Sequence, residues 1–276
     1  MKLTILVDNN TLIDQYFCGE PAVSFWLESS TSHVLFDAGY SDLFLRNALG
    51  LGIAVEKLTH LVLSHGHADH TGGLATLMSR LSEKIDGRNP MLVAHPNVVM
   101  PKYFQQESIG MSVGIDELQK KFSCRFTRQP MQLDEHLFFL GEVPSYFPFE
   151  SRVAIGECCQ QNGSCEQDLL LDDSALVYKS KNGLVVITGC SHSGICNIIQ
   201  HAQELCGEKR IVDIIGGFHL LNASPERIDR TIGFLKQNMP SQLHACHCTD
   251  LAAKIALGCY FPVKEVGVGL RLSYDE

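Results

Sequence analysis

Residues 58–73 read Leu-Thr-His-Leu-Val-Leu-Ser-His-Gly-His-Ala-Asp-His-Thr-Gly-Gly, an apolar strand that runs into a cluster of histidines. The chain has 12 histidines among its 276 residues, and three of them fall with an aspartate inside residues 65–70. From composition alone, this spacing is expected in about one such chain in a thousand, so it is a strong motif signal. We interpret it as a metal site rather than as surface or helix-capping polar residues.

The local geometry of the cluster supports a metal site. Side chains alternate in an extended backbone, so His65 and His67 point the same way. Asp69 and His70 lie where the chain turns into a helix predicted over 71–81, and they approach from a second direction. Two pairs of ligands favour two divalent ions over one. Imidazole with carboxylate favours zinc first, or iron or manganese, over calcium or magnesium.

Three later apolar strands are each followed by a histidine. These are 185–188 with Cys190 and His192, 211–215 with His219, and 243–245 with His247. A lone histidine is more often structural, but three at equivalent strand ends favour a shared site. We take His192 and His247 as metal ligands. His219 is either a ligand or a group that contacts substrate or transfers a proton.

The pattern of apolar residues predicts a layered α/β protein with mixed sheets, because strands dominate early and strands alternate with helices later. The clearest hairpin is 175–188, where Asn182–Gly183 suits a type I′ turn. No repeat or linker divides the chain, so we expect a single domain over 1–276. Residues 97–130 are less regular and are expected to form an insertion or lid, and 142–168 a long loop.

Composition limits the class of protein. Apolar residues make up 45% and charged residues 19%, which excludes a disordered chain. The net charge of −9 argues against nonspecific binding to nucleic acid or to an anionic membrane. No apolar run reaches the ~18 residues of a membrane span, and the first ten residues do not resemble a signal peptide. We therefore expect a cytoplasmic protein with a small-molecule substrate and reduced cysteines, and homo-oligomer formation stays open.

Several segments carry a family resemblance. Leu35-Phe-Asp-Ala-Gly39 and Ser64–Gly73 resemble the metallo-β-lactamase superfamily, whose shared motif is HxHxDH. Thr188–Gly194, Gly216–His219 and His247–Thr249 resemble one branch of it, the metal-dependent hydrolases of the β-lactamase superfamily II. That branch includes archaeal dihydropterin–ribofuranosylaminobenzene phosphate synthases. The resemblance implies a four-layer αββα sandwich with mixed sheets and with metals at one edge, between the two sheets.

The resemblance also implies a ligand set. It assigns metal ligation to His65, His67, Asp69, His70 and His247. Many members place a bridging aspartate where this chain has Cys190, and a further ligand histidine where it has Asp172–Asp173. We expect His192 to compensate and Cys190 to lie beside the ligands. This departure leaves open whether two ions bind equally, or one tightly and one weakly.

A metal site of this kind implies hydrolytic chemistry. A Lewis-acidic ion lowers the pKa of bound water from 15.7 to roughly 7, so hydroxide is available at neutral pH. We expect a metal-dependent hydrolase that uses this hydroxide on a small ester, phosphoester, lactone or thioester. Asp69 is the expected group that orients or deprotonates the water, and His219 is the second catalytic candidate. Asp37 either fixes the tautomer of a ligand imidazole or forms a turn before Gly39.

Three function classes are compatible with the sequence, and the hydrolase is the first of them. Basic residues within 97–130 indicate that its substrate carries an anionic group; they are Lys102, Lys120, Lys121, Arg125 and Arg128. The alternative to a hydrolase is a metal-dependent transferase like the synthases, in which a diphosphate leaves and a carbon nucleophile adds. A redox or iron–sulfur protein is raised by Cys158, Cys159, Cys165, Cys246 and Cys248. Their spacing lacks the usual pattern of iron–sulfur ligation, so this class is the least favoured.

Overall fold

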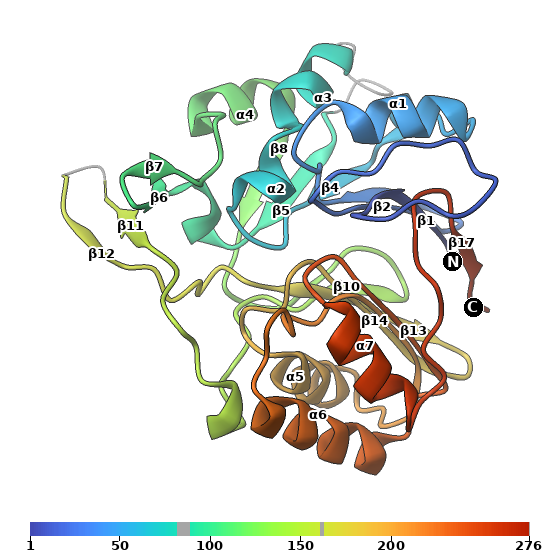
Figure 1. The fold of residues 1–276 in the computed structure, drawn as a ribbon. Helices are drawn as coiled ribbons and strands as arrows, with labels where there is room; N and C mark the ends of the chain where they lie inside the picture. Colours follow the sequence, from blue (N-terminus) through green and yellow to red (C-terminus); the bar gives the residue numbers. More distant parts are fainter. Residues whose placement is uncertain (82–88, 161–162, 276) are drawn as a thin grey trace.

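Two large β-sheets pack face to face, and helices cover both outer faces (Figure 1). The computed structural model describes residues 1–81, 89–160 and 163–275. The inner faces of both sheets share one apolar core, which includes Phe25, Phe36, Tyr178 and Ile187, all at most 1% exposed. Separate clusters pack each sheet against its own helices. The four-layer αββα arrangement expected from sequence is confirmed.

The first sheet comes from the N-terminal half and from the last strand. Its strands, in spatial order, are β17 (Arg271–Ser273), β1 (Lys2–Val7), β2 (Ser24–Glu28), β3 (His33–Phe36), β4 (His60–Val62), β5 (Met91–Ala94) and β8 (Ser123–Phe126). The pairs from β17 to β3 are antiparallel, and those from β3 to β8 are parallel. The helices of this half are α1 (Leu43–Gly50), α2 (Ala68–Thr71), α3 (Leu74–Arg80) and α4 (Ile115–Lys121), with short 3₁₀ turns η1 (Val55–Lys57) and η2 (Pro96–Val99).

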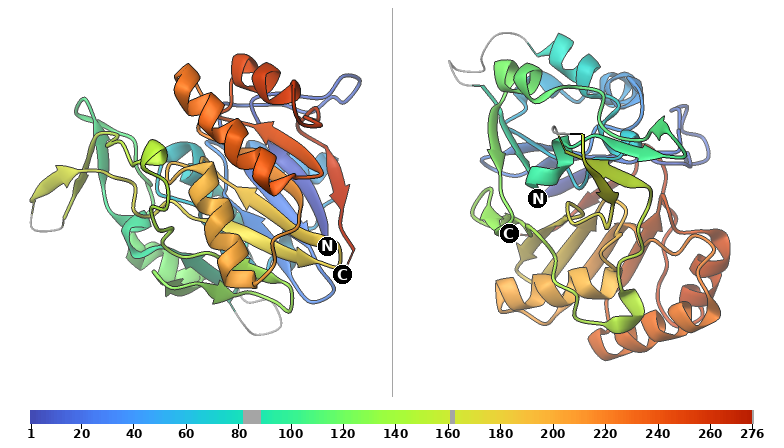
Figure 2. Two further views of the ribbon diagram at one scale, coloured as in Figure 1. Left: turned by 90° about the horizontal axis from the view of Figure 1, so that it is seen from below. Right: turned by 90° about the vertical axis from the view of Figure 1, so that its left-hand side faces the viewer.

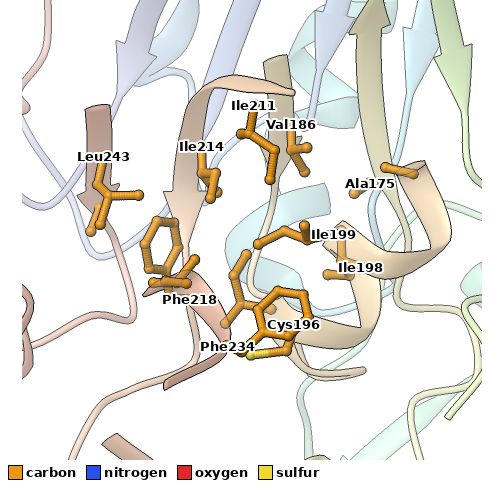
Figure 3. Packing of buried hydrophobic residues seen from close by; sticks show 14 of the residues in the cluster. Ala175, Val186, Cys196, Ile198, Ile199, Ile211, Ile214, Phe218, Phe234 and Leu243 are labelled. Carbon is orange, nitrogen blue, oxygen red and sulfur yellow. The ribbon is translucent and has the colours of Figure 1, made fainter. Parts of the chain in front are cut away.

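The second sheet comes from the C-terminal half. Its order is β16 (Gln242–Cys246), β15 (Ile211–Gly217), β14 (Gly183–Thr188), β13 (Ala175–Ser180), β10 (Leu137–Phe139) and β9 (Met131–Gln132). It is covered by α5 (Ile195–Cys206), α6 (Pro225–Asn238) and α7 (Leu251–Gly258). The 3₁₀ turn η3 (Pro148–Glu150) lies between β10 and β13 along the chain. Figure 3 shows Ile198 and Ile199 of α5 packed toward Val186 and Ile214 of the sheet. This amphipathic packing holds α5, and therefore the loop before it, against the end of β14.

A third, small sheet projects from the body of the protein (Figures 1 and 2). It has the order β12 (Cys165–Gln167), β11 (Glu157–Cys159), β6 (Lys102–Phe104) and β7 (Glu107–Ser108). The sequence prediction missed it, since residues 97–130 read as irregular and 142–168 as a loop. These strands are two or three residues long and mostly polar, so they give no hydrophobic alternation to detect. The lid role of 97–130 and the single-domain organisation stay predictions.

Three local expectations were wrong. Cys159 and Cys165 form a disulfide across β11 and β12, whereas reduced thiols were expected. The 175–188 hairpin exists, but Asn182 has no positive φ, and Ser180 pairs with Gly183, whose φ is +137°. The turn is therefore centred on residues 181–182 and is not type I′. The helix predicted over 71–81 is divided into α2 and α3 around Gly72–Gly73.

Among the described residues, no helix is long and apolar enough to cross a membrane.

Candidate metal centre

The ends of parallel strands bring the candidate ligands together. Strands β14, β15 and β16 run parallel, so the loops that follow them leave from one edge of the second sheet. Those loops carry Cys190, His192, His219 and His247. Strands β3 and β4 are parallel in the first sheet and deliver Asp37 and the segment 64–70 in the same way. The polar clusters at the two edges face each other.

The first group of donors consists of His65, His67 and His192, with ligand atoms that all lie within 4.8 Å of one another. Their rings meet edge to face, with centroids 4.7 to 5.2 Å apart. Nε2 of His65, Nε2 of His67 and both nitrogens of His192 are buried and have no hydrogen-bond partner in the described part of the chain. Burial lowers the pKa of His67 to about 4, and burial together with neighbouring imidazoles holds the pKa values of His65 and His192 well below their usual range.

The second group of donors surrounds Asp69. Its Oδ2 lies 3.5 Å from His70 Nε2 and 3.4 Å from His247 Nε2. Burial by itself raises the pKa of Asp69, but His70 and the other imidazoles hold it well below its usual range, so the carboxylate is ionised. Burial likewise opposes protonation of His70, but Asp69 and Asp37 raise its pKa well above the usual value. Asp69, His65 and His70 also qualify together as a possible ligand group.

Cys190 and His219 lie at the boundary of these groups. Cys190 is within 4.8 Å of donor atoms of His70 and His247 on one side, and of His192 and His219 on the other. The His219 ring centroid is 4.4 Å from that of His192, and its Nδ1 is 3.9 Å from Cys190 Sγ. His219 is half-buried, unlike the buried His65 and His70. Its position therefore suits contact with a bound substrate.

Hydrogen bonds from the Ser64–Asp37 pair orient two of the imidazoles, those of His65 and His70. Ser64 Oγ donates to Asp37 Oδ2 at 2.7 Å and lies 3.0 Å from His65 Nδ1, from which it can accept. Asp37 Oδ2 accepts from His70 Nδ1 at 2.6 Å. These contacts leave Nε2 of both rings facing the cluster, as expected for metal ligands. The interpretation of Asp37 as the partner of a ligand imidazole agrees with this geometry, although its φ of +59° also places it in a turn.

A similar contact lies on the other side of the centre. His247 Nδ1 is 3.4 Å from Asn9 Oδ1, and the backbone N–H of His247 donates to Asp8 Oδ1 at 3.0 Å. The sequence prediction missed Asp8, Asn9 and Ser64. Asp8 and Asn9 directly follow β1, so the strand-end rule that selected the histidines could have included them.

A buried ion-pair cluster supports the segment between His65 and His67. Asp172 Oδ2 accepts from the Gly66 N–H at 2.8 Å, and Lys102 Nζ contacts Asp168 Oδ2 at 2.6 Å and Asp172 Oδ1 at 3.1 Å. A Cβ at position 66 would lie 2.5 Å from the Val98 carbonyl oxygen, so only glycine fits there. Lys102 is fully buried and its charge is already paired. The expectation that Lys102 receives an anionic substrate group was therefore wrong.

The donors fit a transition metal. Buried imidazole nitrogens without hydrogen-bond partners are costly, and a bound cation would satisfy them. Imidazole, carboxylate and thiol together suit zinc, iron or cobalt better than calcium or magnesium. Every residue that the sequence analysis named as a ligand lies in this cluster. The disulfide removes Cys159 and Cys165 from the thiolates that an iron–sulfur cluster would need.

Comparison with known proteins gives consistent results. The family model of the metallo-beta-lactamase superfamily matches residues 19–135. The 7,8-dihydropterin-6-methyl-4-(β-D-ribofuranosyl)-aminobenzene-5′-phosphate synthase of Methanocaldococcus jannaschii is 29% identical over 267 residues, covering 92% of this chain and 89% of that protein. A second protein of that organism, MJ0448, is 31% identical over 252 residues, covering 91% of each.

Solved structures agree with these relatives. The structure of Tm1679, described as a metal-dependent hydrolase of the β-lactamase superfamily, is 30% identical, covers 100% of both chains and has a TM-score of 0.84. A diphosphatase from the PhnP family shares the fold, with a TM-score of 0.57 at 14% identity.

Proposed function

Because the chain belongs to the metallo-β-lactamase superfamily, we propose that it is a metal-dependent hydrolase of a small anionic ester, phosphoester, lactone or thioester. The observation that carries this proposal is the pair of adjacent donor groups, one around His65 and His67 and the other around Asp69. We further propose that the protein acts in the cytoplasm on a small molecule, in keeping with its net charge of −9.

The residues divide into those that hold metal and those that act on substrate. His65, His67 and His192 would hold one ion. Asp69, whose carboxylate lies beside His70 and His247, would hold a second ion together with them. Bound ions would supply Lewis acidity, which lowers the pKa of water and polarises the bond under attack. We propose zinc as the ion, with iron or manganese as alternatives.

Asp69 and His219 are the proposed catalytic residues. The ionised Asp69 carboxylate can accept a hydrogen bond from a water molecule beside the ions and so orient it toward the substrate. His219, half-buried at the edge of the cluster, is placed to bind the substrate or to give a proton to the leaving oxygen or sulfur.

A transferase is the second candidate, and the full-length similarity to the archaeal synthase favours it. In that reaction type a diphosphate leaves a dihydropterin derivative and a carbon nucleophile takes its place. The ligand set can serve both reactions, because in each a bound ion would stabilise the negative charge that develops at the departing or attacked group. The two candidates differ in whether water or a carbon atom is the acceptor.

One activity comparison separates them. Protein loaded with zinc, iron or manganese is assayed against nitrophenyl phosphate esters, a lactone, a thioester, and a dihydropterin diphosphate with and without ribofuranosylaminobenzene phosphate. Turnover of an ester that His67→Ala abolishes and His136→Ala retains supports the hydrolase. His136 is a matched control because it lies beside β10, outside the donor groups. Diphosphate release that requires the aminobenzene acceptor would instead establish the transferase.

A further inference from the structure

The third sheet has almost no apolar core of its own. Among the residues of its four strands only Lys102 is buried, and the others are half-buried or exposed. A short hairpin without an apolar face is at best marginally stable in water. The disulfide between Cys159 and Cys165 joins paired positions of β11 and β12. The order of this hairpin therefore depends strongly on the disulfide.

The hairpin in turn positions both partners of a buried ion pair. Asp168 directly follows β12, and its backbone N–H donates to the carbonyl oxygen of Gly156, just before β11, at 3.0 Å. The Asp168 carboxylate contacts Lys102 Nζ at 2.6 Å. Lys102 lies on β6, where it pairs with Cys158 of β11. Loosening of β11 and β12 would therefore release both sides of this ion pair.

The ion pair reaches the metal centre through a second carboxylate. Lys102 Nζ also contacts Asp172 Oδ1 at 3.1 Å, and Asp172 Oδ2 accepts from the Gly66 N–H at 2.8 Å. Gly66 lies between His65 and His67, two donors of the first group. A continuous set of polar contacts thus runs from the hairpin to the backbone that carries these two imidazoles.

A backbone path runs beside these side-chain contacts. The Ala68 N–H donates to the Ile109 carbonyl oxygen at 2.8 Å, and the Ile109 N–H donates to the Lys102 carbonyl oxygen at 3.0 Å. His67 also forms an isolated antiparallel bridge with Gly110. The third sheet is therefore connected to the ligand segment through both the side chain and the backbone of Lys102.

The disulfide is accessible to a reductant. Cys165 is exposed and Cys159 is half-buried, so a small thiol can approach the bond. Exposed disulfides in a reducing compartment are typically labile and regulatory rather than permanent. A dithiol breaks the S–S bond by transferring two electrons and two protons to the cysteines, and it becomes a disulfide itself.

We propose that the Cys159–Cys165 disulfide is a reversible redox element that sets the metal affinity of the group formed by His65, His67 and His192. The oxidised hairpin keeps the ion pair and the ligand segment in place, and reduction loosens both. The inference rests on the metal centre of the proposed function but not on its reaction. Loss of a contact that orients a ligand lowers metal affinity by about 10- to 100-fold, and reduction only loosens such contacts, so we expect a loss of about 3- to 10-fold.

Zinc affinity tests this proposal without an assay of activity. A His247→Ala background removes a donor of the second group, so that titration with zinc against a chelator reports mainly the first group. In this background, Cys159→Ser/Cys165→Ser should bind zinc about 3- to 10-fold more weakly than the oxidised protein. Cys259→Ser is the matched control, because Cys259 is an exposed free cysteine that directly follows α7, outside the third sheet. It should leave the dissociation constant unchanged.

Reciprocal linkage gives a second measurement. If the disulfide tightens zinc binding, bound zinc must favour the disulfide by the same factor. The His247→Ala protein is equilibrated in glutathione buffers, without zinc and with free zinc held constant by a chelator. Alkylation and mass spectrometry of the peptide that contains Cys159 and Cys165 give the oxidised fraction. Zinc should shift the midpoint toward more reducing buffers by the factor found in the titration.

Equal zinc dissociation constants for the oxidised protein and the double serine variant would overturn the proposal, and so would a midpoint that zinc does not move. The disulfide would then stabilise only its own hairpin. If the double variant does not fold, oxidised protein is compared with the same protein reduced by a phosphine. If no form binds zinc, the metal centre of the proposed function is wrong as well. If all forms bind zinc equally, only the redox element is wrong.

Discussion

His70 Nδ1 donates a 2.6 Å hydrogen bond to Asp37 Oδ2, and both side chains are fully buried. The bond fixes which nitrogen of His70 carries the proton and turns Nε2 toward Asp69. Asp37 also accepts from the backbone N–H and the hydroxyl of Ser64, at 2.7 Å each. One carboxylate at the end of β3 thus aligns the segment that follows β4 with the rest of the centre.

Asp37→Asn should therefore weaken metal binding while the fold is kept. The amide carries one acceptor oxygen in place of two, so it cannot keep all three bonds. Loss of such a supporting contact typically lowers metal affinity by about 10- to 100-fold. Competition titrations of the metal-free protein against a chelator measure the change. Asp42→Asn is the matched control, because Asp42 is exposed and caps no backbone group with its side chain. Equal affinities in the two variants would refute the role of Asp37.

Lys102→Met should strongly destabilise the protein. The lysine is the buried cation between Asp168 and Asp172, and its removal leaves two buried carboxylates uncompensated. Breaking such a pair typically costs about 3–5 kcal/mol in the free energy of unfolding. Urea denaturation of the native protein and the variant gives the difference. Lys120→Met, on the exposed end of α4, should stay within about 0.5 kcal/mol of the native value. A loss of the same small size for Lys102→Met would show that the ion pair is not formed.

The disulfide between Cys159 and Cys165 predicts a specific thiol count. The chain has 11 cysteines, and the nine others are free. Titration of the denatured, unreduced protein with a thiol reagent should give nine thiols per chain, and eleven after reduction. Cys159→Ser/Cys165→Ser should give nine under both conditions. Eleven thiols in unreduced native protein would support the reduced state expected from composition.

The metal-free protein should lose stability in mild acid. Burial keeps His65, His67 and His192 neutral in the folded protein, whereas the unfolded chain binds protons near pH 6.5. The unfolded state therefore gains more protons, and the free energy of unfolding falls as the pH decreases from 6.5 toward 4. His67 alone, with its pKa lowered to about 4, contributes about 3 kcal/mol to this fall. His70 has a raised pKa, so its contribution changes only above pH 6.5.

Urea denaturation of chelator-treated protein at several pH values measures this dependence. His67→Asn should show a shallower fall than the native protein, because one titrating group is gone. A free energy of unfolding that stays constant from pH 7 to pH 4 would contradict the buried, neutral state of these imidazoles.

The sequence alone was sufficient to predict those site residues whose pattern lies within a short stretch of the chain. The histidine cluster of 65–70 and the strand-end positions of His192, His219 and His247 follow from periodicity and residue type, and the structure brings them together. The contacts between Asp172 and Gly66, or between Asn9 and His247, join residues 106 and 238 positions apart. No pattern along the chain records such pairings, because they depend on how the two sheets pack.

The polar third sheet also could not be predicted from the sequence. Its strands β6 and β11 pair Lys102 with Cys158, and neither strand has an apolar face that would reveal it in sequence. The burial of Lys102 was missed for this reason. A lysine in an irregular polar segment reads as solvated, and only the carboxylates from a distant loop make it an interior ion pair.

Metal content per chain tests the central claim most directly. Native protein purified without added metal, and His67→Ala prepared alongside it, are analysed by elemental mass spectrometry with protein concentration from amino-acid analysis. We predict about two transition-metal ions per native chain, zinc foremost, and at most one in His67→Ala, because that variant breaks only the His65–His67–His192 group. Native protein that binds no transition metal even after incubation with zinc, or a variant with an unchanged content, would contradict the assignment of this cluster as a metal centre.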